Sequence, residues 1–403
     1  MRTLVLSDLH LGSVSRSDLL RRAELRAPLL ELAAEVDRVV LLGDVLELRH
    51  GPPRDALVAA RPFFEELGGV LHGKELVLVA GNHDHALIEP WLSQRAESPE
   101  PLPLDLEQLI EPADASPTVA RLAEWAAPTH VRFAYPGLWL RPDVYAMHGH
   151  YLDCHLTVPT LERLSVGAMS RLMRRPASLF ERVDDYEAVT APMYAWRHAV
   201  ARDSPTGDAL NGMSTVRAWG ALSGNDEAVP AWSRRSLQRW LASLGPRLRT
   251  RALVLGFPLA VAALNRAGLG PLKPEISSVE LRRAGLRAMS EVAARVGLGD
   301  AYVIFGHTHR AGPLPGDDAD EWGPPPHGTQ TGAARLLNVG CWTYDSIFLT
   351  DTPGESPYWP GTCAIVEDGG PPELLRLLVD RTHAELDPRA AAKQQASRAE
   401  ARV

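Results

Sequence analysis

The chain has 403 residues, of which 23% are charged and 45% are hydrophobic, a globular composition that excludes wholesale disorder. Its formal net charge of -8 argues against a protein that coats DNA or RNA. The three cysteines (Cys154, Cys341 and Cys363) stand far apart without a Cys-x-x-Cys pair. This spacing excludes a disulfide framework and a thiolate zinc site, and it fits a reducing compartment.

Apolar runs alternate with helical patterns through the first eighty residues. The predicted strands are Thr3–Ser7, Val39–Leu42 and Leu76–Ala80, and the predicted helices between them are Asp18–Val36 and Arg54–Leu67. This alternation indicates an α/β fold in which helices pack on a sheet. Each strand ends in a polar cluster, at the position where such sheets carry their functional loops.

The rest of the chain adds more strands around a long helical stretch. Residues 92–128, rich in proline and glutamate, are predicted to form an excursion. The further predicted strands are Val131–Tyr135, Val144–Met147, Tyr302–Phe305, Arg335–Val339 and Thr362–Val366.

This order predicts a discontinuous core with a large insertion. The core comprises residues 1–150 plus 301–385, the helical cap insertion comprises 151–300, and residues 386–403 form a flexible tail. The insertion has 20 basic and 14 acidic residues, a balance of +6 against -14 for the remainder. Two parts of opposite charge suggest two different tasks.

Five polar clusters directly follow predicted strands. They are Asp8-Leu9-His10, Gly43-Asp44, Gly81-Asn82-His83-Asp84, His148-Gly149-His150 and Gly306-His307-Thr308-His309. In the Asp-x-His and His-x-His pairs both side chains lie on one side, since alternate residues of a strand share a face. One such cluster alone would be an ordinary turn, but five after five strands are not expected by chance.

The clusters contain seven candidate metal ligands: Asp8, His10, Asp44, Asn82, His148, His307 and His309. One ion rarely takes so many, so we predict two divalent ions, with Mn²⁺ as first choice and Fe or Zn²⁺ as alternatives. Two ions sharing a carboxylate lie ~3.5–4 Å apart and can hold a hydroxide between them. With two carboxylates and one hydroxide the site would carry a net charge of about +1, which attracts a phosphate ester.

The motifs DxH, GD, GNHD, HGH and GHTH, in this order, resemble those of the calcineurin-like metallophosphoesterases. The resemblance implies a four-layer αββα sandwich of the α/β class with a large helical insertion. It also implies a first metal held by Asp8, His10, Asp44 and His309, and a second held by Asp44, Asn82, His148 and His307, with Asp44 bridging. His83 would be the catalytic histidine, which protonates the leaving oxygen or hydrogen-bonds the phosphate.

Glu47 lies three residues after Asp44, where some relatives carry an acid that orients the catalytic histidine. Pairing with Glu47 would raise the pKa of His83, and the alternative is a plain surface acid. His150, Asp84 and His85 have no assigned role beyond proximity to the ligands. The stretch from Asn338 to Trp342 resembles the family's late Asn-x-Gly turn and is predicted to be structural.

The HGH cluster followed by a helical cap more weakly resembles the branch that cleaves UDP-2,3-diacylglucosamine. The chain departs from that branch at His83, where an arginine is usual, at His150, where an acid is usual, and in its longer insertion. The resemblance therefore points to a type of substrate, a lipid-linked phosphoester or a nucleotide diphosphate.

Within the insertion, arginines are interleaved with Trp232 and Trp240 ahead of the apolar run Ala252–Leu264. These arginines are Arg234, Arg235, Arg239, Arg247, Arg249 and Arg251. A run of thirteen residues is shorter than the ~20 needed to span a membrane. It is predicted either as a buried cap helix or, with the arginines, as a peripheral contact of residues 232–264 with an anionic membrane.

Together these features predict a metal-dependent hydrolase that cleaves a phosphodiester or pyrophosphate bond. The absence of a signal-peptide pattern at the N-terminus predicts a cytoplasmic protein, peripheral at most to the inner face of the membrane. A nuclease of the same superfamily is the alternative, although the acidic core makes an extended nucleic-acid track less favourable. A non-catalytic interaction module would have lost ligands, and here all seven are present.

Overall fold

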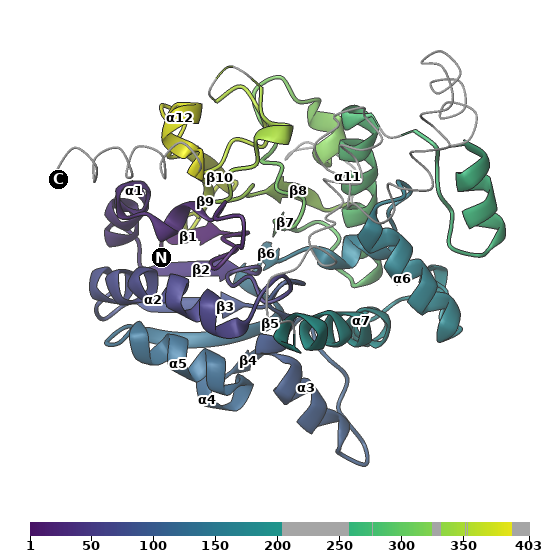
Figure 1. Ribbon diagram of the computed structural model, residues 1–403, viewed down its shortest axis with the longest axis horizontal. Coiled ribbons are helices and arrows are strands. Elements are labelled where there is room, and N and C mark those ends of the chain that lie inside the picture. Colours follow the sequence, from purple (N-terminus) through teal and green to yellow (C-terminus); the bar gives the residue numbers. More distant parts are fainter. Residues whose placement is uncertain (204–257, 276, 325–331, 351, 353, 389–403) are drawn as a thin grey trace.

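The computed structural model describes residues 1–203, 258–275, 277–324, 332–350, 352 and 354–388. One curled sheet runs through its centre in the order β10-β9-β1-β2-β3-β5-β6-β7-β8, and β4 pairs with β5 off this path (Figure 1). The strands are β1 (Thr3–Leu6), β2 (Arg38–Leu42), β3 (Glu75–Val79), β4 (Glu107–Ile110), β5 (His130–Arg141), β6 (Val144–Met147), β7 (Tyr302–Phe305), β8 (Arg335–Asn338), β9 (Thr362–Val366) and β10 (Glu373–Arg376). All the strands predicted from the sequence are confirmed, and β4 and β10 are additions.

Strand β5 joins the two halves of the sheet. Its first part pairs in parallel with β3, and its last part, from Gly137 onward, pairs antiparallel with β6. The sequence analysis predicted a strand that ends at Tyr135, and the next residues, Pro136 and Gly137, are of types that normally interrupt strands. The strand instead continues through them to Arg141, and the two sheets of the expected sandwich are therefore continuous.

Alternating side chains build the layers. Along β1, Leu4 and Leu6 join one hydrophobic cluster, whereas Val5 joins a second cluster enclosed between the two halves of the sheet. Helices α1 (Ala23–Ala34), α2 (Pro53–Val70) and α5 (Pro117–Trp125) cover the first half, and α6 (Leu161–Leu172), α7 (Val183–Asp203) and α11 (Ser278–Arg295) cover the second. The predicted four-layer αββα arrangement is confirmed (Figure 1).

The segment predicted as an excursion contributes to the core. It holds α3 (Glu89–Ala96), β4, α4 (Pro112–Ala115) and α5. Strand β4 pairs with β5, and Val119 and Leu122 of α5 are buried in the first hydrophobic cluster. Near the C-terminus a short helix, α12 (His383–Leu386), buries Leu386 in the same cluster.

In the described part of the chain between β6 and β7, all the regular secondary structure is helical, and loops join the helices. The predicted run of arginines with Trp232 and Trp240 lies outside the described residues, as does the tail beyond residue 388. Of the apolar run, residues 258–264 are described and form a helix in which Val261 is buried and Leu259 is exposed. In the described part of the chain, every helix is too short or too polar to cross a bilayer.

Candidate metal centre

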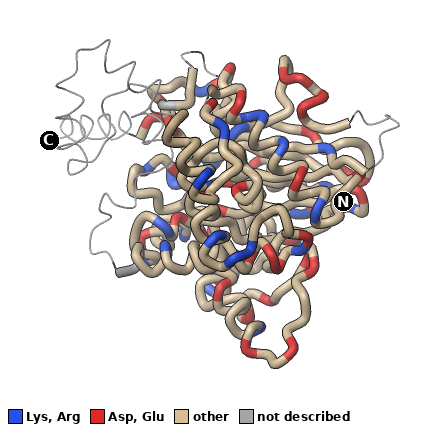
Figure 2. The backbone as a smooth tube through the Cα atoms, turned by 90° about the vertical axis from the view of Figure 1, so that its right-hand side faces the viewer, with Lys and Arg blue, Asp and Glu red and all other residues tan. Residues whose placement is uncertain are grey.

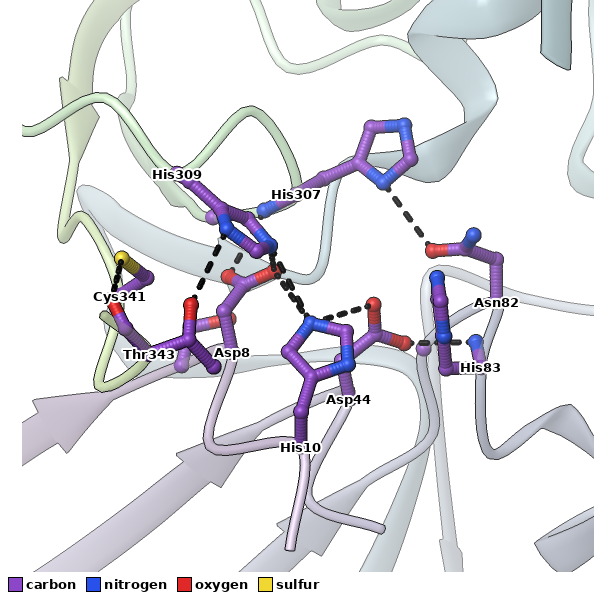
Figure 3. A network of polar contacts seen from close by, with 12 residues as sticks. Asp8, His10, Asp44, Asn82, His83, His307, His309, Cys341 and Thr343 are labelled. Carbon is purple, nitrogen blue, oxygen red and sulfur yellow. Dashed lines mark hydrogen bonds and ion pairs between the residues drawn. The ribbon is translucent and has the colours of Figure 1, made fainter. Parts of the chain in front are cut away.

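The seven predicted ligands meet at one edge of the curled sheet. Asp8, Asp44 and Asn82 follow the parallel strands β1, β2 and β3, and His148 and His307 follow the parallel strands β6 and β7. Their side chains converge from both halves of the sheet, as Figure 3 shows for six of the seven. The carboxyl ends of these strands share one edge because the halves curl toward each other.

A first group of donor atoms comprises Asp8, His10 and His309. Nε2 of His309 lies 3.2 Å from Oδ1 of Asp8 and 3.1 Å from Nε2 of His10. Nε2 of His10 lies 3.8 Å from the same Asp8 oxygen. Metal–ligand bonds of ~2.1 Å separate neighbouring donor atoms by roughly 3.0–3.4 Å, so most of these spacings suit one ion.

A second group comprises Asn82, His148 and His307. Oδ1 of Asn82 lies 3.1 Å from Nε2 of His148 and 3.0 Å from Nδ1 of His307. Oδ2 of Asp44 lies 3.4 Å from Nε2 of His148 and 3.6 Å from Nε2 of His10. One carboxylate oxygen is therefore within donor-atom spacing of both groups, which is the position of a bridging ligand.

The backbone at the ligands is strained. Among the described residues other than glycine, eight have a positive φ, and five of these are predicted ligands. Their φ values lie between 46° and 64°, for Asp8, His10, Asp44, His307 and His309. This conformation costs about 1–3 kcal/mol per residue and persists where the surrounding structure imposes it, typically at functional sites.

Two glycines of the motifs are required by close packing. A Cβ atom at Gly81 would lie 2.3 Å from Oδ1 of Asp44, and one at Gly306 would lie 2.3 Å from Oδ2 of Asp8. Any larger residue would displace a carboxylate of the site. This explains why the asparagine and histidine clusters each begin with glycine.

The donor set fits cations. Oδ1 of Asp8 is buried and has no hydrogen bond to any residue that the structure describes, and the amide oxygen of Asn82 faces acceptor atoms of His148, His307 and Asp44. Burial would raise the pKa of Asp8, but the charge of His309 and the close approach of His10 hold it well below its usual range. Oxygen and nitrogen acceptor atoms that face one another repel each other unless a cation lies between them, so this donor set is suited to divalent ions.

Glu47 is buried beside the ligands and contacts several histidines. Its Oε2 lies 2.8 Å from Nδ1 of His83, 3.2 Å from Nδ1 of His10 and 3.2 Å from Nδ1 of His50. The alternative of a surface acid is wrong, because Glu47 is only 4% exposed. Glu47 does act to raise the pKa of His83, as predicted, but burial has the larger effect and lowers that pKa to about 4.

Further partners hold the ligand imidazoles. Nδ1 of His148 lies 3.0 Å from the carbonyl oxygen of Leu42, and Nε2 of His307 lies 3.0 Å from Oδ2 of Asp153. Each contact leaves the other ring nitrogen toward the centre, as is usual for metal-binding histidines. Asp153 was missed by the sequence analysis, and no motif marks it, since it lies 154 residues from its partner.

The uncertain residues of the motifs separate into distinct roles. The carboxylate of Asp84 accepts backbone N–H groups of Gly81, Asp44, Val45 and Leu46 at 2.7–3.2 Å, and so ties the asparagine loop to the Asp44 loop. His85 points away to Glu187 of α7, at 3.1 Å. His150 is buried, and neither ring nitrogen has a hydrogen-bond partner among the described residues.

Asn338 has the structural role predicted for it. Its Nδ2 donates to the carbonyl oxygen of Gly306 at 2.8 Å and to Oγ1 of Thr308 at 2.9 Å. Its Oδ1 accepts from the backbone N–H of Gly340 at 2.9 Å. These contacts hold the loop that carries His307 and His309.

A comparison with protein families agrees with this geometry. The family model described as calcineurin-like phosphoesterase matches residues 1–186. The match includes the clusters from Asp8 to His148, and His307 and His309 lie beyond it in sequence but in the same centre. No curated protein matches the chain.

Proposed function

The chain belongs to the calcineurin-like metallophosphoesterases, which are metal-dependent hydrolases of phosphoric esters, and we propose that it cleaves a phosphodiester or pyrophosphate bond using two divalent ions. One observation carries this proposal. A single carboxylate oxygen, Oδ2 of Asp44, lies within 3.6 Å of a histidine from each donor group. That arrangement supports a pair of ions sharing one ligand.

The side chains of the site divide the work between them. Two divalent ions, when bound, would supply positive charge at the phosphoryl oxygens and lower the pKa of an attacking water. Asp44 would hold both, and its Oδ1 also accepts the backbone N–H of His83 at 2.7 Å, which fixes that histidine beside the centre. Since Nδ1 of His83 is paired with Glu47, its Nε2 is the atom available to the substrate or the leaving oxygen.

The first test is hydrolysis of bis-p-nitrophenyl phosphate by protein stripped of metal and then reloaded with Mn²⁺, Fe²⁺ or Zn²⁺. We expect no turnover without metal and turnover at two bound ions per chain. Equal turnover by the metal-free protein, or full turnover at one ion per chain, would contradict the proposal. The same titration identifies the preferred metal, for which Mn²⁺ is our expectation.

For the substrate, we propose a lipid-linked phosphoester or diphosphate. A groove of about 230 Å³ lies between α6 and α7, lined mainly by apolar side chains: Ser165, Ala168, Met169, Leu172, Met193, Trp196 and Arg197. Leu172 and Trp196 are 78% and 67% exposed. Each buried CH₂ contributes ~0.8 kcal/mol, so an acyl or prenyl chain of a few carbons in this groove would strongly favour one substrate.

Charged contacts connect the groove to the metal centre. Nη1 of Arg197, at the groove, lies 3.6 Å from Oε1 of Glu162, and Nη2 of Arg49, beside Asn82, lies 3.6 Å from the same oxygen. Basic and acidic residues are interspersed over the described chain on this side of the molecule (Figure 2). A mixed surface favours a small anionic head group over a long nucleic acid.

The proposal includes a peripheral contact of residues 232–264 with an anionic membrane, supported by the exposure of Leu259. We expect flotation with anionic vesicles that is lost at high salt, and a much lower KM for acylated than for deacylated substrates. Replacing Arg247, Arg249 and Arg251 with serine should weaken flotation and leave hydrolysis of bis-p-nitrophenyl phosphate unchanged. Equal KM values without flotation would favour a soluble nucleotide, and turnover of DNA alone would favour a nuclease.

A further inference from the structure

Arg49 carries a buried positive charge beside the centre that the ligand scheme does not use. It lies two residues beyond Glu47 and is 5% exposed, and its backbone N–H donates to Oε1 of Glu47 at 3.0 Å. Among the described residues its Nε has no hydrogen-bond partner, and its ion pair from Nη2 to Glu162 spans 3.6 Å, longer than a hydrogen bond. Burying a cation whose acceptor is this distant is costly, so a position of this kind indicates a missing anion.

The neighbouring asparagine indicates where that anion lies. With its amide oxygen turned toward His148 and His307, as a metal ligand requires, Asn82 places its amide nitrogen 2.6 Å from Nη1 of Arg49. Two donors then face each other without an acceptor. Rotating the amide would give Arg49 an acceptor but would remove the Asn82 oxygen from the second donor group. An anionic oxygen that accepts from both side chains satisfies Asn82 and Arg49 together.

We propose that the guanidinium of Arg49 binds a phosphoryl oxygen of the substrate, next to Asn82 and on the same side as His83. This inference rests on the proposed phosphoesterase function and assigns its recognition of the anion to a residue outside the metal ligands. A guanidinium suits the task because it stays charged and offers two parallel N–H donors to a phosphoryl group. The competing role is structural, with Arg49 serving only as the counter-ion of Glu162.

The test compares Arg49→Gln and Arg49→Lys with a matched control, Arg54→Gln. Arg54→Gln removes the same charge five residues further on, but the Arg54 side chain is 80% exposed and pairs with the neighbouring Asp55. Binding of inorganic phosphate to the metal-loaded protein is measured by calorimetry, alongside KM and kcat for bis-p-nitrophenyl phosphate. Metal content and Tm are recorded for each variant.

For Arg49→Gln we expect the phosphate affinity to fall and KM to rise, each by about 10- to 100-fold, with two ions still bound. Arg49→Lys should recover part of the phosphate affinity, because lysine restores the positive charge but not the two parallel N–H donors. Arg54→Gln should behave as wild type. Unchanged phosphate affinity in Arg49→Gln would overturn the inference. A lower Tm in that variant with unchanged phosphate affinity would establish the structural role instead.

The outcomes also separate this inference from the proposed function. If the wild type hydrolyses phosphodiesters and Arg49→Gln binds phosphate equally well, the function stands and the role of Arg49 fails. If the wild type binds phosphate through Arg49 but hydrolyses no phosphoester with any metal, the inference stands and the proposed function fails.

Discussion

The two donor groups of the centre differ in how firmly their histidines are held. In the second group, His148 is fully buried, with Nδ1 3.0 Å from a backbone carbonyl oxygen, and His307 is 3.0 Å from the Asp153 carboxylate. In the first group, His309 has a side chain that is 34% exposed, and its Nδ1 lies 3.4 Å from a hydroxyl, that of Thr343. The second group is therefore the better preorganised of the two.

The difference suggests a division of labour. A rigid, buried group binds its ion tightly, because little side-chain freedom is lost on binding. The first group is more open, and through His10 it shares the carboxylate of Glu47 with His83. We therefore expect the second ion to be the more tightly bound and the first to be coupled to the catalytic histidine. Four predictions test this comparison.

The largest effect is expected for Asp44→Ala, since Asp44 alone lies within ligand spacing of both groups. Both ions and essentially all turnover should be lost, as measured by metal analysis after dialysis and by hydrolysis of bis-p-nitrophenyl phosphate. Asp8→Ala is the matched control and should retain one ion. An Asp44→Ala protein that keeps two ions and near-normal turnover would contradict the bridging role.

His83→Ala should leave both groups intact and slow turnover by about 10²–10⁴-fold, because its side chain is assigned to the substrate although it lies close to His10 and Asp44. Metal content should equal that of the wild type. Loss of an ion in this variant would show that His83 is a ligand. Glu47→Gln should resemble His83→Ala in turnover and also weaken the first ion, because Glu47 contacts both His83 and His10.

Asp153→Asn should weaken the second ion by about 10- to 100-fold, the usual effect of removing a carboxylate behind a ligand histidine. Thr343→Val, the corresponding change behind His309, should weaken the first ion only a few-fold. Competition with a chromogenic chelator measures both affinities. Similar losses in the two variants would abolish the distinction between the groups.

The last prediction concerns pH and involves no substitution. In the metal-free protein burial would lower the pKa of His10, but its contacts with Asp8 and Glu47 raise it to about 10. Burial would also lower the pKa of His148, but its contacts, chiefly that with the negative charge of Asp44, raise that pKa to about 9. Both imidazoles are protonated below these values, so metal binding must expel their protons, and affinity should rise up to about tenfold per pH unit for each proton. Calorimetry at pH 7 in two buffers should detect the release; no buffer dependence would contradict it.

The sequence determined which residues form the centre and on which elements they lie. A ligand such as Asp8 and the strand before it belong to one short segment, so the strand brings the ligand to the edge of the sheet. The same local rule places His307 and His309 after β7, but the predicted strand alternation does not set the direction of these pairs, because all four residues lie beyond the strands and have positive φ. The strands of the sandwich could likewise be read from apolar runs, apart from β4, β10 and the second part of β5, where Pro136 and Gly137 concealed the continuation.

The tertiary structure alone decided what surrounds those ligands. The contacts of His307 with Asp153, of Asn82 with Arg49, and of Glu47 with His83 join residues 33 or more positions apart and exist only when neighbouring parallel strands pair and bring their loops together. The packing of these loops also sets burial, which lowers the pKa of His83 although its partner is a carboxylate. A local pattern specifies a ligand because strand and side chain are covalently adjacent, whereas hydrogen-bond partners and desolvation depend on distant segments packing together.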